Sequence, residues 1–450
     1  MKRTILLLTA ALGAAIAAAQ QPAPAPTAAQ PRPTDRVRRT ETVPYDTRHD
    51  AEARDRAASG HTIDFRPEVR VATEGPLYAV LGQQIEIPYV WTDGCVYLRI
   101  ENPQSAYQLW VNDRRVADVD DALTPAEFDL TEYVRQGKND FKLLMFDDRG
   151  GLDARNPVAR AAFEGSCLYY QEKRSIADFE IALAPDSAGR DFGVLRLDLL
   201  VRNGYNYDEP VTVGYDIYSP QGKLLDFDMR EVVVAGRSVD TVRFRPYIYH
   251  TFDNKWEAGA KSAPLYKVML FTRRDGAYRE YMPLRIGFGR TELVDGKLMR
   301  FGRELRLEKA VCNAAADRKT TLGRLRALKS QGKNTVCPDY PQPKWFYDMC
   351  DKAGMFVIDR ANINSPTNSN IRSVGGTPAN DPALIEEYLT RVKSMYYRSR
   401  NHSCVIGFAL GGADSGNGYC MYKAYEWLKS VEKERPVFYE GAEGEWNTDL

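Results

Sequence analysis

The chain is poor in the residues that several classes of protein require. Only four of its 450 residues are histidines, too few and too scattered for a metal cluster, so we expect no metal and no cofactor. The seven cysteines fit neither a disulfide scaffold nor a zinc site, and in an exported protein an odd number leaves at least one thiol without an intrachain partner. Lysine plus arginine equals aspartate plus glutamate at 61 each, which argues against a nucleic-acid partner.

The N-terminus has the pattern of a secretory signal peptide over residues 1–19. Lys2 and Arg3 precede an apolar run from Ile5 to Ala19 that ends in small residues. This run is short and rich in alanine for a bilayer span, so we expect cleavage near Gln20 and no membrane span afterwards; a short membrane anchor is the alternative. The mature protein is therefore expected to be exported, to the periplasm, the cell surface or the medium.

Three further regions are predicted before a clear change of pattern. Residues 20–42 begin with a stretch of Pro, Ala, Gln and Thr that buries too little apolar surface to fold, which predicts a linker. Residues 43–174 contain short alternating segments separated by turn residues, the pattern of a β-sandwich of the jelly-roll kind. Residues 175–285 repeat this pattern with a spacing that fits a seven-stranded immunoglobulin-like sandwich.

Residues 286–450 are different, because amphipathic helices now alternate with short apolar strands. This alternation predicts a partial α/β barrel, so the fold class is a multidomain β protein with an α/β domain. One buried strand, Val405 to Leu410, ends in a glycine-rich loop, and such loops carry the active sites of α/β barrels. The predicted helices are Lys319–Gln331, Trp345–Ala353, Pro382–Arg398 and Tyr419–Val431.

Several motifs in these regions resemble one known family. They are Trp110-Val111-Asn112, Phe128-Asp129-Leu130, Gly137-x-Asn139, Trp256-Glu257, Pro264-Leu265-Tyr266, Arg400-Asn401-His402 and Arg435-Pro436-x-x-Tyr439-Glu440. Together they resemble glycoside hydrolase family 2, the β-galactosidase type, from about Val43 to the end of the sequence. The resemblance implies a sugar-binding jelly roll, an immunoglobulin-like sandwich and a TIM barrel that uses two carboxyl groups for retaining hydrolysis.

The acid/base position of that family is altered here. The family pattern R-N-H-P-S-V-I-x-W-S-L-G-N-E corresponds to RNHSCVIGFALGGADSGN, which starts at Arg400. Aligning through Gly411 places the acid at Ala413, and aligning through Gly416 places it at Asp414. Aspartate is shorter than glutamate by one carbon, and a misplacement of about 1 Å costs about a hundredfold in rate. Asp414 is therefore the candidate for a degenerate acid/base residue.

The second carboxylate is expected to be absent. The sequence ends at Leu450, just after residues 445–449, which resemble the start of the next strand. A complete barrel takes about 250 residues, so these observations predict a barrel truncated at its C-terminal side. A half barrel exposes two strand edges, which proteins normally cover. We therefore expect a partner, either a second copy of this chain or another protein of the cell envelope.

Other polar positions of the family pocket are also replaced. Asp339 stands where the family has histidine, and Arg360 and Asn364 stand where it has glutamates, which makes these three residues the candidates for ligand contact. Residues with packing roles persist, including Asp359 and Asn362. The sequence thus predicts a catalytically degenerate β-galactosidase-like protein that binds carbohydrate or another protein. The alternatives are an active exported hydrolase using Asp414 with a partner's carboxylate, and a truncated product without function.

Overall fold

The computed structural model describes residues 39–450 with gaps at several loops. The gaps are Ala57, Asn102, 147–151, 154–162, 185–192, 260–262, Ala316, 366–372 and 374–375, together with the side chains of Ala184 and Asp414. The predicted signal peptide and most of the predicted linker lie outside the described residues. The described residues belong to one compact unit. In the part of the chain that is described, no helix has the length and apolarity needed to cross a bilayer.

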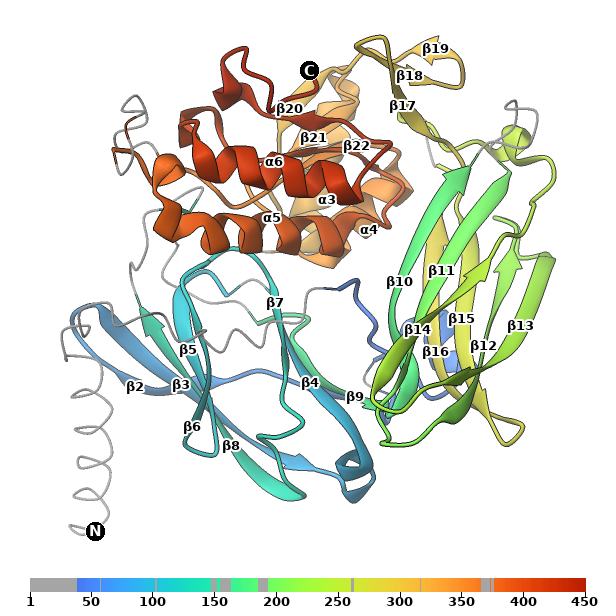
Figure 1. The fold of residues 1–450 in the computed structure, drawn as a ribbon, viewed down its shortest axis with the longest axis vertical. Coiled ribbons are helices and arrows are strands. Elements are labelled where there is room, and N and C mark those ends of the chain that lie inside the picture. Colours follow the sequence, from blue (N-terminus) through green and yellow to red (C-terminus); the bar gives the residue numbers. More distant parts are fainter. Residues whose placement is uncertain are drawn as a thin grey trace. The chain divides into compact units, whose positions relative to one another are not determined.

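The first sandwich consists of two antiparallel sheets (Figure 1). One sheet has the order β1 (Thr62–Asp64), β9 (Cys167–Glu172), β4 (Gly94–Ile100), β7 (Ala126–Asp129). The other has the order β2 (Glu68–Ala72), β3 (Leu77–Ile87), β8 (Gly137–Phe146), β5 (Ala106–Val111), β6 (Arg114–Val119). The predicted Asn112 and Asn139 motifs meet here, because the Nδ2 atom of Asn112 donates to Oδ1 of Asn139 at 2.7 Å. Asn112 and Asp113 form the β5–β6 turn with positive φ angles of 49° and 61°, which asparagine and aspartate tolerate better than most residues.

The described part of the second sandwich has seven strands, the number that the sequence predicted. One sheet has the order β10 (Arg174–Ala184), β11 (Val194–Asn203), β14 (Ser238–Phe244), and the other β13 (Leu224–Val234), β12 (Glu209–Tyr218), β15 (Tyr266–Arg274), β16 (Ala277–Ile286). Strand β11 explains the alternating apolar pattern of the sequence, because every second residue from Leu195 to Val201 is fully buried. This period of two places one face of the strand in the core.

Residues 39–42 correct the predicted linker boundary, because they are part of the folded structure. Arg39 is buried, and its Nε donates to Oε1 of Glu127 at 2.9 Å. Thr40 and Thr42 are also buried. The linker prediction extended to residue 42 because composition does not reveal which polar residues find buried partners.

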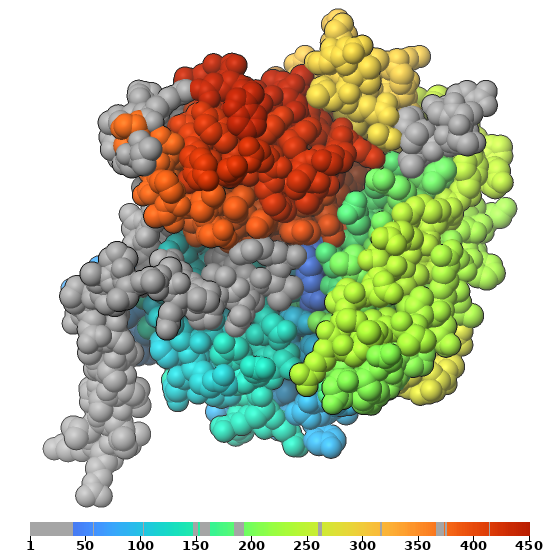
Figure 2. All heavy atoms as spheres, viewed as in Figure 1, coloured from blue at the N-terminus to red at the C-terminus, as the bar shows by residue number. Residues whose placement is uncertain are grey.

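The barrel segment is a five-stranded parallel sheet with helices outside it (Figure 1). It follows a small sheet of β17 (Thr291–Val294), β18 (Lys297–Arg300) and β19 (Arg303–Glu304). The parallel strands, in order, are β20 (Lys309–Val311), β21 (Thr335–Cys337), β22 (Phe356–Arg360), β23 (Val405–Ala409) and β24 (Val437–Phe438). The helices are α3 (Arg318–Ser330), α4 (Lys344–Ala353), α5 (Ile385–Ser399) and α6 (Tyr419–Val431), so all four predicted helices form. Side chains of α5 and α6, orange to red, form the outer surface of this segment in Figure 2.

The remaining helical elements are short. The α-helix α2 (Arg48–Ala53) precedes the first sandwich strand and lies near β16. Six 3-10 turns are described: η1 (Tyr89–Asp93), η2 (Thr251–Asn254), η3 (Pro378–Asn380), η4 (Pro382–Leu384), η5 (Ala413–Ser415) and η6 (Glu440–Ala442). The predicted helix from Pro382 thus begins as a 3-10 turn, in which the Asp381 side chain accepts a hydrogen bond from the Ala383 amide.

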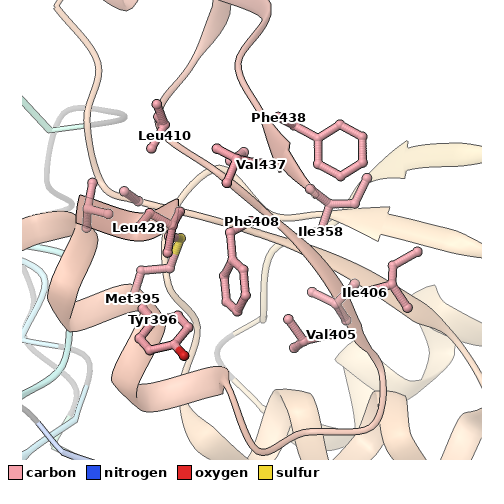
Figure 3. Close-up of a cluster of buried hydrophobic side chains, with 14 of the residues drawn as sticks. Ile358, Met395, Tyr396, Val405, Ile406, Phe408, Leu410, Leu428, Val437 and Phe438 are labelled. Carbon is pink, nitrogen blue, oxygen red and sulfur yellow. The ribbon is translucent and has the colours of Figure 1, made fainter. Parts of the chain in front are cut away.

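Strand β23 is buried on both faces, as its apolar run predicted. Phe408 points toward Met395 and Tyr396 of α5, while Phe438 of β24 lies on the other side of the strand (Figure 3). Gly407 permits this arrangement, because a Cβ atom there would lie 2.4 Å from the ring of Phe438. A glycine is therefore needed where the aromatic ring crosses the inner face of the sheet.

The sheet is strongly curved. Nζ of Lys309 in β20 lies 5.1 Å from the ring centre of Phe438 in β24, although these are the two outermost strands. In a flat sheet, four steps of about 4.8 Å would separate them by about 19 Å, further than both side chains reach. The five strands therefore form a barrel wall, with Lys309 and Phe438 on its inner side.

One of the two predicted open edges is covered by the chain itself. The Asp449 amide donates to the Val437 carbonyl at 2.8 Å, and the Val437 amide donates to the Asp449 carboxylate at 2.8 Å. The Tyr439 amide donates to Oγ1 of Thr448 at 3.1 Å. These bonds satisfy the outer backbone groups of β24. Only β20, where Val311 is 63% exposed, keeps an edge without a described neighbour, so the two-edge expectation is corrected to one edge.

Candidate functional site

A polar cluster lies at the carboxyl ends of the parallel strands. Asn313 follows β20, Asp339 follows β21, and Arg360 is the last residue of β22. Because parallel strands end at the same edge of the sheet, these three side chains are brought together. The Asn313 Nδ2 donates to Oδ2 of Asp339 at 2.7 Å, and the Asp339 amide donates back to Oδ1 of Asn313 at 2.9 Å.

Arg360 completes this cluster. Its Nη1 lies 3.6 Å from Oδ1 of Asp339, and the two side chains are 18% and 34% exposed. Two of the three predicted ligand contacts, Asp339 and Arg360, are thus paired with one another. The Asp339 carboxylate has a cation and an amide as partners, so it serves as an acceptor within a polar cluster rather than as a bare nucleophile. Sequence reasoning missed Asn313, although its position directly after the first barrel strand was a usable signal.

Asn364, the third predicted ligand contact, lies beside the glycine-rich loop instead. A Cβ atom at Gly412 would lie 3.6 Å from Oδ1 of Asn364, which places the amide against that loop. The loop is fixed to residue 363, because Gly412 N and Ser415 Oγ both donate to the Ile363 carbonyl, at 3.1 and 2.8 Å. The backbone of Asp414 lies in η5, and its side chain is outside the described atoms.

Asp359 is a second carboxylate near this end, but it points away from it. The Tyr347 hydroxyl on α4 donates to Oδ1 of Asp359 at 2.8 Å, and the carboxylate is fully buried. Burial raises the pKa of Asp359 to about 6, opposed by hydrogen bonds from Ser399, Tyr347 and the Arg360 amide. Because it faces the helices, it fixes α4 against β22 and serves the packing role expected for it.

Cys337 and Lys309 fill space on the inner side of the wall. Burial raises the pKa of the Cys337 thiol, so it remains protonated and a poor nucleophile at neutral pH. All seven cysteines are free, and five of them are buried. The inner wall thus carries a small uncharged side chain at the end of β21.

Three potential metal ligands meet at the opposite end of the sheet. One ligand atom from each of Asp348, Asp351 and His402 lies within 4.8 Å of the others. This grouping was not predicted, because the histidines looked isolated in sequence. Lys344 contacts Asp348 at 2.9 Å, and Asp351 accepts from Nδ1 of His402 and from the Cys404 amide, both at 2.7 Å.

These partners explain the cluster without an ion. Although burial acts to raise it, Lys344, His402 and Arg54 hold the pKa of Asp348 well below its usual range. Cations therefore neutralise Asp348, and the hydrogen bonds of Asp351 fix the start of β23 to α4. The cluster is a structural ion-pair network.

The chain combines two antiparallel sandwiches with a barrel segment that has a polar cluster at the carboxyl ends of its strands. Residues 314–449 match the sequence model of the glycosyl hydrolases family 2 TIM barrel domain, and residues 60–152 match that of the family 2 sugar binding domain. The chain belongs to glycosyl hydrolase family 2. The resemblance and fold class predicted from the motifs are confirmed.

Individual relatives agree with this assignment. A β-galactosidase of Priestia megaterium is 26% identical over 375 residues, which cover 78% of this chain and 35% of the relative. One of Erwinia tasmaniensis is 27% identical over 351 residues, covering 75% and 33%. The chain thus spans about a third of the length of these curated relatives.

Solved structures show the same fold. A family 2 member from Bacteroides cellulosilyticus matches with a TM-score of 0.65 at 16% identity, covering 80% of this chain and 49% of that one. A β-glucuronidase from Bacteroides uniformis matches with a TM-score of 0.64 at 15% identity, covering 80% and 46%. At such identities the likeness concerns the fold alone.

Proposed function

We propose that this chain is a family 2 protein that binds carbohydrate, or acts as a scaffold, without hydrolysing glycosidic bonds. The observation that carries the proposal is the Asp339–Arg360 pair at the carboxyl ends of the strands. Retaining hydrolysis requires two carboxyl groups about 5 to 5.5 Å apart, one as acid and one as nucleophile. Of the carboxylates near these strand ends, Asp339 is instead occupied by Arg360 and Asn313.

The same cluster suits an uncharged polar ligand. The guanidinium of Arg360 offers donors, and the Asp339 carboxylate offers acceptor sites. The Asn364 amide, beside the glycine-rich loop, offers both. Sugar hydroxyls both donate and accept, so they match this mixture. Because two relatives are β-galactosidases, a β-galactoside is the first ligand to test.

The purified protein is expected to bind galactosides but not to turn them over. Nitrophenyl-β-galactoside should give no hydrolysis above the uncatalysed rate, and Asp414→Ala should leave that result unchanged. In titration calorimetry, Arg360→Met should weaken galactoside binding about tenfold, through loss of a charge-assisted hydrogen bond. Arg318→Met, on the exposed start of α3, is the matched control.

Two outcomes decide between the alternatives. Clear hydrolysis that Asp414→Ala abolishes would establish an active hydrolase and end the non-hydrolytic proposal. Absence of both turnover and galactoside binding would leave the scaffold role, in which the interaction is with protein.

A partner chain is proposed at the remaining open edge. Strand β20 exposes Val311 and has no described strand beyond it, and unpaired strand edges attract other strands. Light scattering is expected to give the mass of two chains, and Val311→Pro, which removes an amide on the side of β20 that faces away from β21, should shift it to one. A wild-type protein that is monomeric at micromolar concentration would remove the second-copy form of this proposal.

A further inference from the structure

A cavity of about 260 Å³ lies at the amino ends of the barrel strands, away from the candidate site. Its walls come from β10 and β11 of the second sandwich, residues 286–291, and the segments 400–406 and 431–435, which lead into β23 and β24. Arg300 of β18 also lines it. None of the residues at the carboxyl ends of the strands takes part, so any function of this cavity is independent of the proposed carbohydrate site.

Cations outnumber carboxylates in the lining of this cavity. The cationic side chains are Arg196, Arg290, Arg300, Arg400, Lys433 and Arg435, and the carboxylates are Glu180, Glu432 and Glu434. Arg196 and Arg290 share Glu434, at 3.2 and 3.4 Å. Arg435 pairs with Glu432 at 2.6 Å. Arg400 pairs with Asp178 at 2.8 Å and with Glu180 at 3.6 Å, so the surplus of positive charge comes from Arg300 and Lys433.

Arg300 is the source of much of that surplus. It is 6% exposed, and among the described residues no carboxylate lies within ion-pair distance of it, although Glu257 is near enough to oppose the effect of burial on its pKa. Its Nη1 donates to Oγ1 of Thr291 at 2.9 Å, its Nη2 donates to the Trp256 carbonyl at 2.6 Å, and its Nε has no partner. Burial lowers the pKa of Arg300 to about 10. A buried charge without a counter-charge is strongly unfavourable.

Aromatic rings and a glycine nevertheless accommodate this guanidinium. The rings of Trp256, Phe301 and Phe356 lie 5.2 to 5.4 Å from its Cζ, which offsets part of the desolvation. Gly289 leaves room for it, since a Cβ atom there would lie 2.2 Å from Nη2. The chain therefore holds an unpaired arginine in a fixed position at the wall of a cavity.

We propose that this cavity binds a small organic anion bearing phosphate or carboxylate groups, with Arg300 as its main contact. A guanidinium donates to two oxygens of such a group in parallel, and an anion would supply the missing counter-charge. The volume is below the roughly 300 to 1,000 Å³ of drug-sized pockets, so the ligand is small. Lys433, an exposed residue of the lining, supplies a second cation for a second anionic group.

Calorimetry with inorganic phosphate and with citrate tests the proposal, and their relative affinities show which group is preferred. Both are expected to bind the purified protein, more weakly as salt rises, whereas glycerol should not bind. Arg300→Met should weaken anion binding at least about tenfold, the loss of a charge-assisted hydrogen bond. Arg303→Met, an exposed position three residues away, should bind as the wild type does.

Thermal unfolding supplies a second readout. Without anion, Arg300→Met should melt at a higher temperature than the wild type, because the unpaired buried charge is gone. Citrate should then raise the melting temperature of the wild type and of Arg303→Met more than that of Arg300→Met. The proposal is wrong if neither anion binds the wild type, or if Arg300→Met binds as tightly.

A variant that keeps the charge guards against misfolding. If Arg300→Met does not fold, Arg300→Lys retains a cation but loses the planar fork, and about tenfold weaker binding is expected. Unchanged affinity in Arg300→Lys would overturn the assigned role. If Arg300→Met is less stable than the wild type and the wild type binds no anion, the role of Arg300 is packing against the aromatic rings, and the proposal is wrong.

Discussion

Replacing Arg391 with methionine is expected to lower the free energy of unfolding by about 3 to 5 kcal/mol. Arg391 lies on α5 and is 1% exposed. Its Nη1 donates to Oδ1 of Asp153 at 2.8 Å and to the Asn362 carbonyl at 2.7 Å, and its Nε donates to Glu387 at 2.8 Å. Asp121, from the loop before β7, lies 3.9 Å away. Without the guanidinium, buried carboxylates would lose their counter-charge.

Urea unfolding followed by tryptophan fluorescence measures this loss. The matched control is Lys393→Met on the same helix, where the ammonium is partly exposed and a change within about 0.5 kcal/mol is expected. Adding Asp153→Asn to Arg391→Met should restore part of the stability, because one uncompensated charge is then removed. A loss below about 1 kcal/mol for Arg391→Met would contradict the inferred importance of this contact.

Replacing Glu280 with glutamine is expected to stabilise the protein at pH 8 and to have little effect at pH 4.5. Glu280 lies on β16, where it accepts from the Ile176 amide at 2.8 Å and from Nε2 of Gln171 at 3.3 Å. Burial raises the pKa of this carboxyl from 4.5 to about 7, with Glu172 adding to the effect and Arg202 opposing it. Its protonated form is therefore favoured in the folded state.

The direction follows from proton linkage. The folded protein binds this proton more tightly than the unfolded chain, so its stabilisation is complete below about pH 4.5 and is lost as the pH rises through about 7. A pKa difference of this size corresponds to about 3 kcal/mol. Because glutamine resembles the protonated acid, Glu280→Gln should avoid the loss.

Unfolding free energies at pH 4.5, 6 and 8 test this expectation. Between pH 4.5 and pH 8, the unfolding free energy of Glu280→Gln should rise relative to that of the wild type by up to about 3 kcal/mol. Glu231→Gln, at an exposed position on β13, should show the same pH dependence as the wild type. Asp359, with its pKa near 6, adds pH dependence of the same sign in both proteins. Equal gains for Glu231→Gln, or none for Glu280→Gln, would show that Glu280 is not the group responsible.

The sequence predicted the fold through features that are local. Helix α6 begins and ends at the predicted residues, and β23 is buried as its apolar run indicated. The alternation along β11 and the turn residues Asn112 and Asp113 marked the sandwiches. Such features depend on residues a few positions apart, so a single sequence contains all the information they need.

The sequence indicated where the candidate residues lie, but not which of them pair with one another. Asp339, Arg360 and Asn364 lie at the strand ends as expected, yet the pairing of Asp339 with Arg360 and Asn313 was not foreseen. That pairing joins segments 21 and 26 residues apart, and the register of parallel strands decides it. The covering of β24 by Thr448 and Asp449 was missed for the same reason.

What the sequence by itself determined is the order of two sandwiches and a barrel segment, and the family. Only the tertiary structure decided which charges are paired. It joined Arg391 to Asp153 across 238 residues, and it buried Arg300 without a carboxylate. The physical reason is that the energy of a charge depends on the solvent and the charges within a few ångströms, and chain folding alone sets those neighbours.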